Sequence, residues 1–405
     1  MIHFLQEAAI YVIPWLLVLT LIVTVHELGH FLAAKACDVA IDTFSIGFGR
    51  ALASWKDKSG VEWRIGWIPL GGYVRFAGDE NAASVPDQHD LDELRQEIVR
   101  TEGAGAVGRY FHFKPLWQRA FITIAGPAAN FLLAIVIFAS ILMIFGDRVL
   151  PAKIAQIQPG SAAEAAGFKA GDLVVQADGH RIAAFDDLQQ VVQIRGGLPT
   201  VFVVKRGGED LTLTATPRWK SVSDSIAGEQ KIGILGIVPV QNRSDFISVK
   251  YDPASALVAG AQQTWKTLQM SVFGLGRIIT GQISADQLHG PLGIAHMTGN
   301  LAKASAEVSP DVKSLILFGG GNLLKLAAII SVGIGFMNLL PVPVLDGGHL
   351  MFYAFEAATR RPVSAHIQAA GYRVGLALVL GLMLFATWND LQQLQVFKFI
   401  GGLFL

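Results

Sequence analysis

Long apolar runs constrain the fold of this chain more than any other feature of its sequence. A helix of about 20 mostly apolar residues crosses the hydrocarbon core of a bilayer. Four runs approach or exceed that length: Ile10 to Ala34, Phe121 to Phe145, Leu326 to Leu345 and Val374 to Trp388. Charged residues make up only 16% of the chain, against about a quarter in soluble domains. The sequence therefore predicts a multi-span α-helical membrane protein with four transmembrane helices.

The distribution of Lys and Arg around these runs predicts their orientation, because basic residues accumulate in cytoplasmic loops. Lys35 and Arg50 follow the first run, and Arg360 and Arg361 lie between the third and fourth. Both loops are expected in the cytoplasm. Both termini and the large segment between the second and third runs are then expected outside it. The net charge is zero, which gives no indication of nucleic-acid binding.

The first apolar run contains the sequence His26-Glu27-Leu28-Gly29-His30, an H-E-x-x-H motif. Residues i and i+4 share one face of a helix, so both imidazoles can reach one zinc ion, and Glu27 can contact water there without being a ligand. Ionisable side chains are costly inside a membrane helix unless they have partners. A zinc ion would provide those partners. The alternative is a buried polar cluster that serves helix packing.

A catalytic zinc has three protein ligands and an open position, so a third ligand must come from elsewhere. The single cysteine, Cys37, cannot assemble a thiolate site. The best candidate is Asp346, at the end of the third apolar run, where Pro341 and Pro343 break the helix. Counted along the two runs, Asp346 and the histidines reach a similar depth on the cytoplasmic side. His349 is a rival ligand that the sequence leaves open.

Together these residues resemble the site-2 protease family, in its bacterial branch that regulates the sigma-E stress response. The resemblance rests on the H-E-x-x-H motif, on Gly126-Pro127-Ala128-Ala129-Asn130, and on Asn338 through Gly347, which is similar to the family's N-x-x-P-x-P-x-L-D-G signature. It implies His26, His30 and Asp346 as ligands of Zn²⁺, Glu27 as the catalytic acid/base and Asn338 as a substrate-binding residue. We interpret Gly126 to Asn130 mainly as a helix-packing segment.

Two soluble segments complete the expected fold. Pro159 to Asp172, with strand and hairpin signals up to Leu213, resembles a bacterial PDZ domain, which binds peptides at a sheet edge. Only one such repeat is present, where some relatives have two. Val61 to Trp67 alternates apolar and polar residues, and Leu70-Gly71-Gly72-Tyr73-Val74 follows as a turn and return strand. In the family such a β-hairpin lies at the membrane beside the active site, so Gly71 and Gly72 are candidate substrate-binding residues.

The predicted order is therefore a first transmembrane helix, a cytoplasmic segment with the β-hairpin, a second transmembrane helix, an inserted extracytoplasmic α+β PDZ domain, an extracytoplasmic linker with amphipathic helices, and the last two transmembrane helices. The boundaries are 1–34, 35–117, 118–146, 150–240, 241–322 and 323–405.

The resemblance implies a metalloendopeptidase of the bacterial inner membrane that cleaves single-span membrane proteins within the lipid bilayer. Its substrates would be a trimmed anti-sigma factor or signal-peptide remnants, and the PDZ domain would bind peptide C-termini or exclude untrimmed substrates. One alternative is a non-enzymatic membrane adaptor with a relict metal site. Intact Glu27 argues against it, because a relict site need not keep a residue that is not a ligand. A metal transporter would need further ligands along a pathway, and the other apolar runs contain few.

Overall fold

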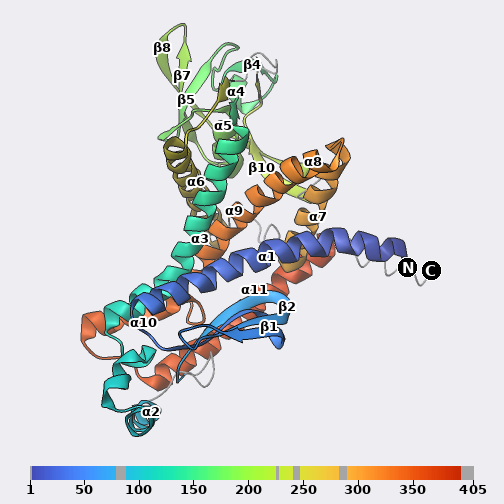
Figure 1. The fold of residues 1–405 in the computed structure, drawn as a ribbon. Coiled ribbons are helices and arrows are strands. Elements are labelled where there is room, and N and C mark those ends of the chain that lie inside the picture. Colours follow the sequence, from blue (N-terminus) through green and yellow to red (C-terminus); the bar gives the residue numbers. More distant parts are fainter. Residues whose placement is uncertain (1, 79–87, 225–227, 240–246, 282–289, 394–405) are drawn as a thin grey trace, which may run out of the picture. The chain divides into compact units, whose positions relative to one another are not determined.

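The computed structural model describes residues 2–78, 88–224, 228–239, 247–281 and 290–393 (Figure 1). These form two compact units. The first comprises residues 1–138, 260–271 and 288–405, and the second comprises residues 139–259 and 272–287. Each unit has its own sheets and core, so each is described by itself.

Long apolar helices dominate the first unit. Four stretches of the described residues are long and apolar enough to cross a membrane: Ala9–Ala36, Leu116–Phe145, Val312–Asn338 and Ala365–Gln392. They correspond to α1 (Ile2–Ala36), α3 (Leu116–Phe145), α9 (Gly320–Asn338) with the turns before it, and α11 (Ala365–Gln393). Further helices are α2 (Gln88–Thr101), α7 (Pro291–Val308) and α10 (Asp346–Thr359). The expected multi-span helical architecture is therefore present.

The third span differs from the expected Leu326 to Leu345. It begins earlier, with α8 (Val312–Ser314) and a π-helical turn at Leu315–Gly319, and α9 ends at Asn338. Residues 339–345 form turns, because proline cannot donate a backbone hydrogen bond and clashes with a preceding helical turn. Asp346 was expected at the end of the third helix, but it begins the separate helix α10. The third span and Asp346 therefore lie on different rigid elements.

A bent sheet packs beside α1, formed by β1 (Ile41–Lys56) and β2 (Glu62–Phe76). Residues 51–56 pair with 62–66 as a hairpin, while 41–46 pair with both 62–65 and 72–76. The expected return strand around Tyr73 therefore pairs with Ser45, not with the strand at Val61 to Trp67. The strand β1 was not predicted from the sequence. The Thr20 hydroxyl donates to the Pro69 carbonyl at 2.8 Å, which ties the sheet to α1.

The second unit is an α+β fold. Its main sheet has the order β6-β5-β7-β8, from His180–Arg181, Leu173–Ala177, Thr200–Arg206 and Glu209–Ala215. The other strands form three antiparallel pairs: β3 (Asp147–Val149) with β12 (Ile247–Val249), β4 (Ile154–Ile157) with β11 (Ile237–Pro239), and β9 (Arg218–Asp224) with β10 (Gly228–Ile234).

The core of this unit lies between the sheets and helices α4 (Ala162–Ala165) and α5 (Phe185–Ile194). Phe202, Leu188 and Ile154 are almost completely buried there. The completely buried Asp172 carboxylate pairs with Arg206 at 2.8 Å, so its charge is compensated. The long helix α6 (Pro253–Ile279) begins with Asp252 as its N-cap and contributes residues to both units.

Candidate metal centre

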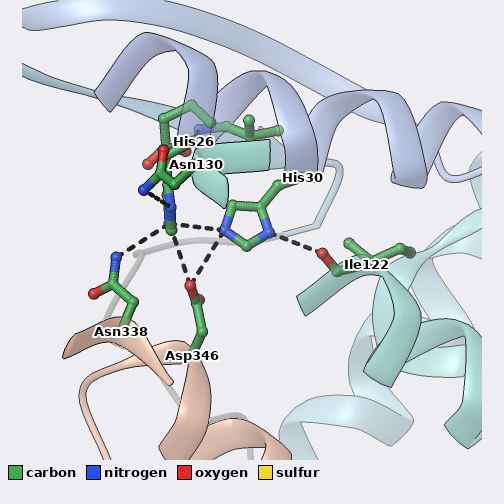
Figure 2. Close-up of polar contacts among 8 residues, drawn as sticks. His26, His30, Ile122, Asn130, Asn338 and Asp346 are labelled. Carbon is green, nitrogen blue, oxygen red and sulfur yellow. Dashed lines mark hydrogen bonds and ion pairs between the residues drawn. The ribbon is translucent and has the colours of Figure 1, made fainter. Parts of the chain in front are cut away.

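Two histidines of α1 converge on one point beside the helix. His26 and His30 are four residues apart, and their Nε2 atoms lie 3.2 Å from each other (Figure 2). Their side chains are only 9% and 14% exposed. The helical spacing expected from the motif therefore places both ring nitrogens where one ion can bind them.

Asp346 reaches the same point from the first turn of α10. Its Oδ2 atom lies 3.2 Å from His26 Nε2 and 3.6 Å from His30 Nε2. A carboxyl group binds a metal ion in its ionised form, and a cation beside it favours that form.

The spacing of these three atoms fits a zinc ion. Zinc lies about 2.0–2.2 Å from nitrogen and oxygen ligands, so the ligand atoms of a tetrahedral site are about 3.3–3.6 Å apart. The observed separations are 3.2, 3.2 and 3.6 Å. Asp346 Oδ2 is buried and, within the described residues, accepts no hydrogen bond of good geometry. Three converging acceptors of this kind repel one another unless a cation lies between them.

Helix α3 supports both imidazoles from behind. His30 Nδ1 lies 2.8 Å from the Ile122 carbonyl, and His26 Nδ1 lies 3.2 Å from the side-chain amide of the completely buried Asn130 (Figure 2). If Nε2 binds zinc, Nδ1 carries the proton and must donate it. The Asn130 atom that faces His26 must then be the amide oxygen, which can accept this proton. The oxygen and nitrogen of an amide are distinguished by their hydrogen-bond partners.

Close packing of small residues brings α3 against the zinc face of α1. A Cβ atom at Gly126 would lie 2.3 Å from His30 Nε2, and one at Gly29 would lie 2.3 Å from the Ala125 carbonyl. The expected packing of Gly126 to Asn130 is therefore present, and the side chain of Asn130 also contacts His26. The partner of Asn130 could not be predicted, because His26 is distant in the chain.

The Gly126→Ala variant is expected to weaken zinc binding by about 10-fold or more. The added methyl group must displace His30 from the shared ligand position, since helix backbones leave no other space. Gly333→Ala in α9 is the matched control, because a Cβ atom there meets nothing within 4 Å. Chelator competition on the purified proteins measures the change. Equal zinc affinities in both variants would contradict the packing argument.

Glu27 lies between the metal centre and the sheet. Its Oε2 atom accepts a hydrogen bond of 3.1 Å from the Val74 N–H of β2, and a Cβ atom at Gly72 would lie 3.5 Å from Glu27 Cγ. Gly71 instead packs against the Phe48 ring. The structure thus brings Gly72 next to Glu27.

Asn338 and His349, both singled out in the sequence, have different surroundings. The side-chain amide of Asn338 lies 3.5 Å from His26 Nε2, at the edge of the metal centre (Figure 2). The His349 ring lies with Nε2 2.8 Å from the Tyr372 hydroxyl of α11. Burial lowers the pKa of His349, so the ring is neutral. The described His-His-Asp group contains Asp346 and not His349.

The sequence is similar to those of known proteins along nearly its whole length. The sequence matches peptidase family M50 over residues 14–382. The chain belongs to this family. This chain, below called the M50 peptidase, is 52% identical over 399 residues to the metalloprotease MmpA of Caulobacter vibrioides, and the match covers 98% of each chain. It is 31% identical over 439 positions to the zinc metalloprotease RasP of Geobacillus kaustophilus, covering 94% of this chain and 98% of RasP.

These matches confirm the resemblance to the site-2 protease family and the assignment as an enzyme. The M50 peptidase is a metalloendopeptidase that uses zinc, and its described residues include one His-His-Asp group that can hold the ion. A non-enzymatic adaptor is therefore the wrong class for this chain.

Proposed function

We propose that this M50 peptidase cleaves single-span membrane proteins within the bilayer, with His26, His30 and Asp346 as zinc ligands and Glu27 as general base. One observation carries the proposal. The two histidines lie on a helix long and apolar enough to cross a membrane, and Glu27 beside them accepts a hydrogen bond from the Val74 N–H of β2. These contacts support a site in which the hydrolytic groups lie beside a sheet edge and within the membrane.

The residues of the site divide the chemistry between them. Zinc, when bound, acts as a Lewis acid and makes water acidic enough to lose a proton near neutral pH. Glu27 takes that proton and passes it to the leaving amine. The Val74 N–H fixes Oε2 of Glu27, so the carboxylate stays beside His26 without ligating the metal. We assign the binding of the substrate carbonyl to Asn338, and its position 3.5 Å from His26 Nε2 supports this role.

A membrane helix must unwind before its backbone can be attacked, because its N–H and C=O groups are bonded within the helix. Residues 72–76 pair with 41–46 on one side. The substrate then adds as a strand along the other edge, beside Glu27, where main-chain hydrogen bonds replace those of the helix. Gly71 and Gly72 belong to this substrate-binding edge.

The second unit is proposed to be the PDZ domain, over about residues 150–240, outside the cytoplasm of a bacterial cell. Its α+β fold and its pairing of β4 with β11 support this assignment. There it excludes substrates that keep a large outer domain, so that a first protease must trim them. Anti-sigma factors and signal-peptide remnants are substrates of this kind, and the enzyme lies in the inner membrane with its zinc toward the cytoplasm.

A trimmed and an untrimmed single-span substrate, reconstituted with the peptidase in lipid vesicles, test both parts of the proposal. The wild type is expected to cut only the trimmed substrate, at a peptide bond inside its apolar segment. Residues 150–246 can be replaced by a short Asn-Gly turn, because Val149 and Ile247 are paired neighbours on β3 and β12. That variant is expected to cut both substrates.

Mass spectrometry of the products gives the cleavage position. Cleavage only outside the apolar segment would contradict intramembrane proteolysis. An untrimmed substrate that stays intact with the deletion variant would contradict the exclusion role of the second unit but not the proposed chemistry.

A further inference from the structure

The three proposed zinc ligands come from two helices, and a third helix contacts both. Helix α3 has Arg119, Ile122, Gly126 and Asn130 at helical spacings of three and four residues, along one face. Ile122, Gly126 and Asn130 contact His30 and His26 of α1. Arg119, one turn before Ile122, contacts α10 instead.

Helix α10 carries a matching polar stripe of Asp346, His349, Tyr353 and Glu356, also at spacings of three and four residues. Asp346 faces the two histidines, and His349 faces Tyr372 of α11. Glu356 Oε1 accepts a hydrogen bond of 2.7 Å from Arg119 Nη2. The Arg119 guanidinium also lies 5.1 Å from the centre of the Tyr353 ring.

The burial of this pair distinguishes it from ordinary surface ion pairs. The side chains of Arg119 and Glu356 are 19% and 22% exposed, whereas those of Arg109 and Asp38 are 55% and 78% exposed at 3.7 Å. Exposed pairs contribute little, but removing one partner of a partly buried pair leaves an uncompensated charge. The Arg119–Glu356 contact is therefore a firm attachment of α10 to α3.

We propose that Arg119 and Glu356 are positioning residues that hold Asp346 at its coordinating distance from His26 and His30. The inference rests on the proposed ligand set. Asp346 is the first residue of α10 and follows the turns at residues 339–345, so a rotation of α10 about its own axis moves the carboxylate. The contact with Arg119 lies ten residues along the helix, roughly 15 Å from Asp346. Attachment at that distance resists such a rotation. Ile122, which lies on α3 with Arg119, contacts His30 (Figure 2).

Charge reversal in the full-length, detergent-solubilised protein tests this inference, with zinc affinity measured by chelator competition. Arg119→Glu and Glu356→Arg are each expected to weaken zinc binding by about 10-fold or more, as is typical of residues that support a metal ligand. The double variant, which restores the pair in reversed order, is expected to recover most of the affinity. Arg109→Glu, in the exposed pair with Asp38, is the matched control and should bind zinc like the wild type.

Wild-type affinity in both single variants would overturn the positioning role, and so would a double variant no better than the singles. Asp346→Ala is measured in the same series. If it also binds zinc normally, the ligand assignment itself is wrong, which separates a failure of the proposed function from a failure of this inference.

Glu356→Gln provides a second test if the reversed charges prevent folding. It keeps the shape of the side chain and removes its charge. The melting temperature of the zinc-free protein is expected to fall, because Arg119 loses its charged partner. The increase produced by zinc is expected to become smaller as well. A lower zinc-free melting temperature with an unchanged zinc-induced increase would mean that the pair only stabilises the fold, and would overturn the inference.

Discussion

Glu27→Gln is expected to abolish peptide cleavage while zinc stays bound. The glutamine oxygen can still accept the hydrogen bond from the Val74 N–H, so the side chain keeps its place. It cannot take a proton from water, and loss of a general base typically lowers the rate by about 10²–10⁴-fold. Zinc content and cleavage of a single-span substrate in detergent, measured on the same preparations, give the result.

Glu97→Gln, at an exposed position of α2, is the control for this substitution and should leave both quantities unchanged. One zinc per chain in the wild type and in Glu27→Gln, with equal cleavage by both, would place the proton transfer on another residue. Loss of zinc from Glu27→Gln would instead make Glu27 part of the metal centre.

Asp346→Ala is expected to remove both zinc and activity. A catalytic zinc has three protein ligands, and the variant leaves only His26 and His30. The loss of zinc affinity should exceed the 10–100-fold or so that follows when a residue merely supports a ligand. Chelator competition measures the affinity, and substrate cleavage is followed in parallel.

His349→Ala is the matched control, because His349 is only three residues away and is the other candidate ligand. Its ring contacts the Tyr372 hydroxyl, so the variant should retain zinc. If His349→Ala loses zinc and Asp346→Ala keeps it, the third ligand has been assigned to the wrong side chain.

Local patterns in the sequence predicted much of this structure. The spacing of His26 and His30 on an apolar helix was sufficient to expect both rings at one ion, and the geometry agrees. The hairpin signals before Leu213 predict two strands joined by a turn, and Gly207 and Gly208 form that turn between β7 and β8. Both predictions rest on residues close together in the chain, where helical or hairpin geometry fixes the distance.

The contacts that complete the site were not predictable in this way. Asn130 and Val74 reach His26 and Glu27 across long sequence separations, and neither residue type indicates its partner. The strand β1 was not predicted because Gly47 and Gly49 lie inside it, both at positive φ, and glycine is disfavoured in the interior of a strand. The end of the third span was misplaced because apolar residues continue past Asn338 into the turns that contain Pro341 and Pro343.

The start of α10 at Asp346 has a consequence for biosynthesis. The first two ligands emerge from the ribosome early, on the first membrane helix, whereas the third follows only after α9 and the whole second unit have been made. Two histidines alone do not form a catalytic zinc site. On the proposed ligand set, the nascent peptidase is therefore expected to stay inactive until α10 has been made.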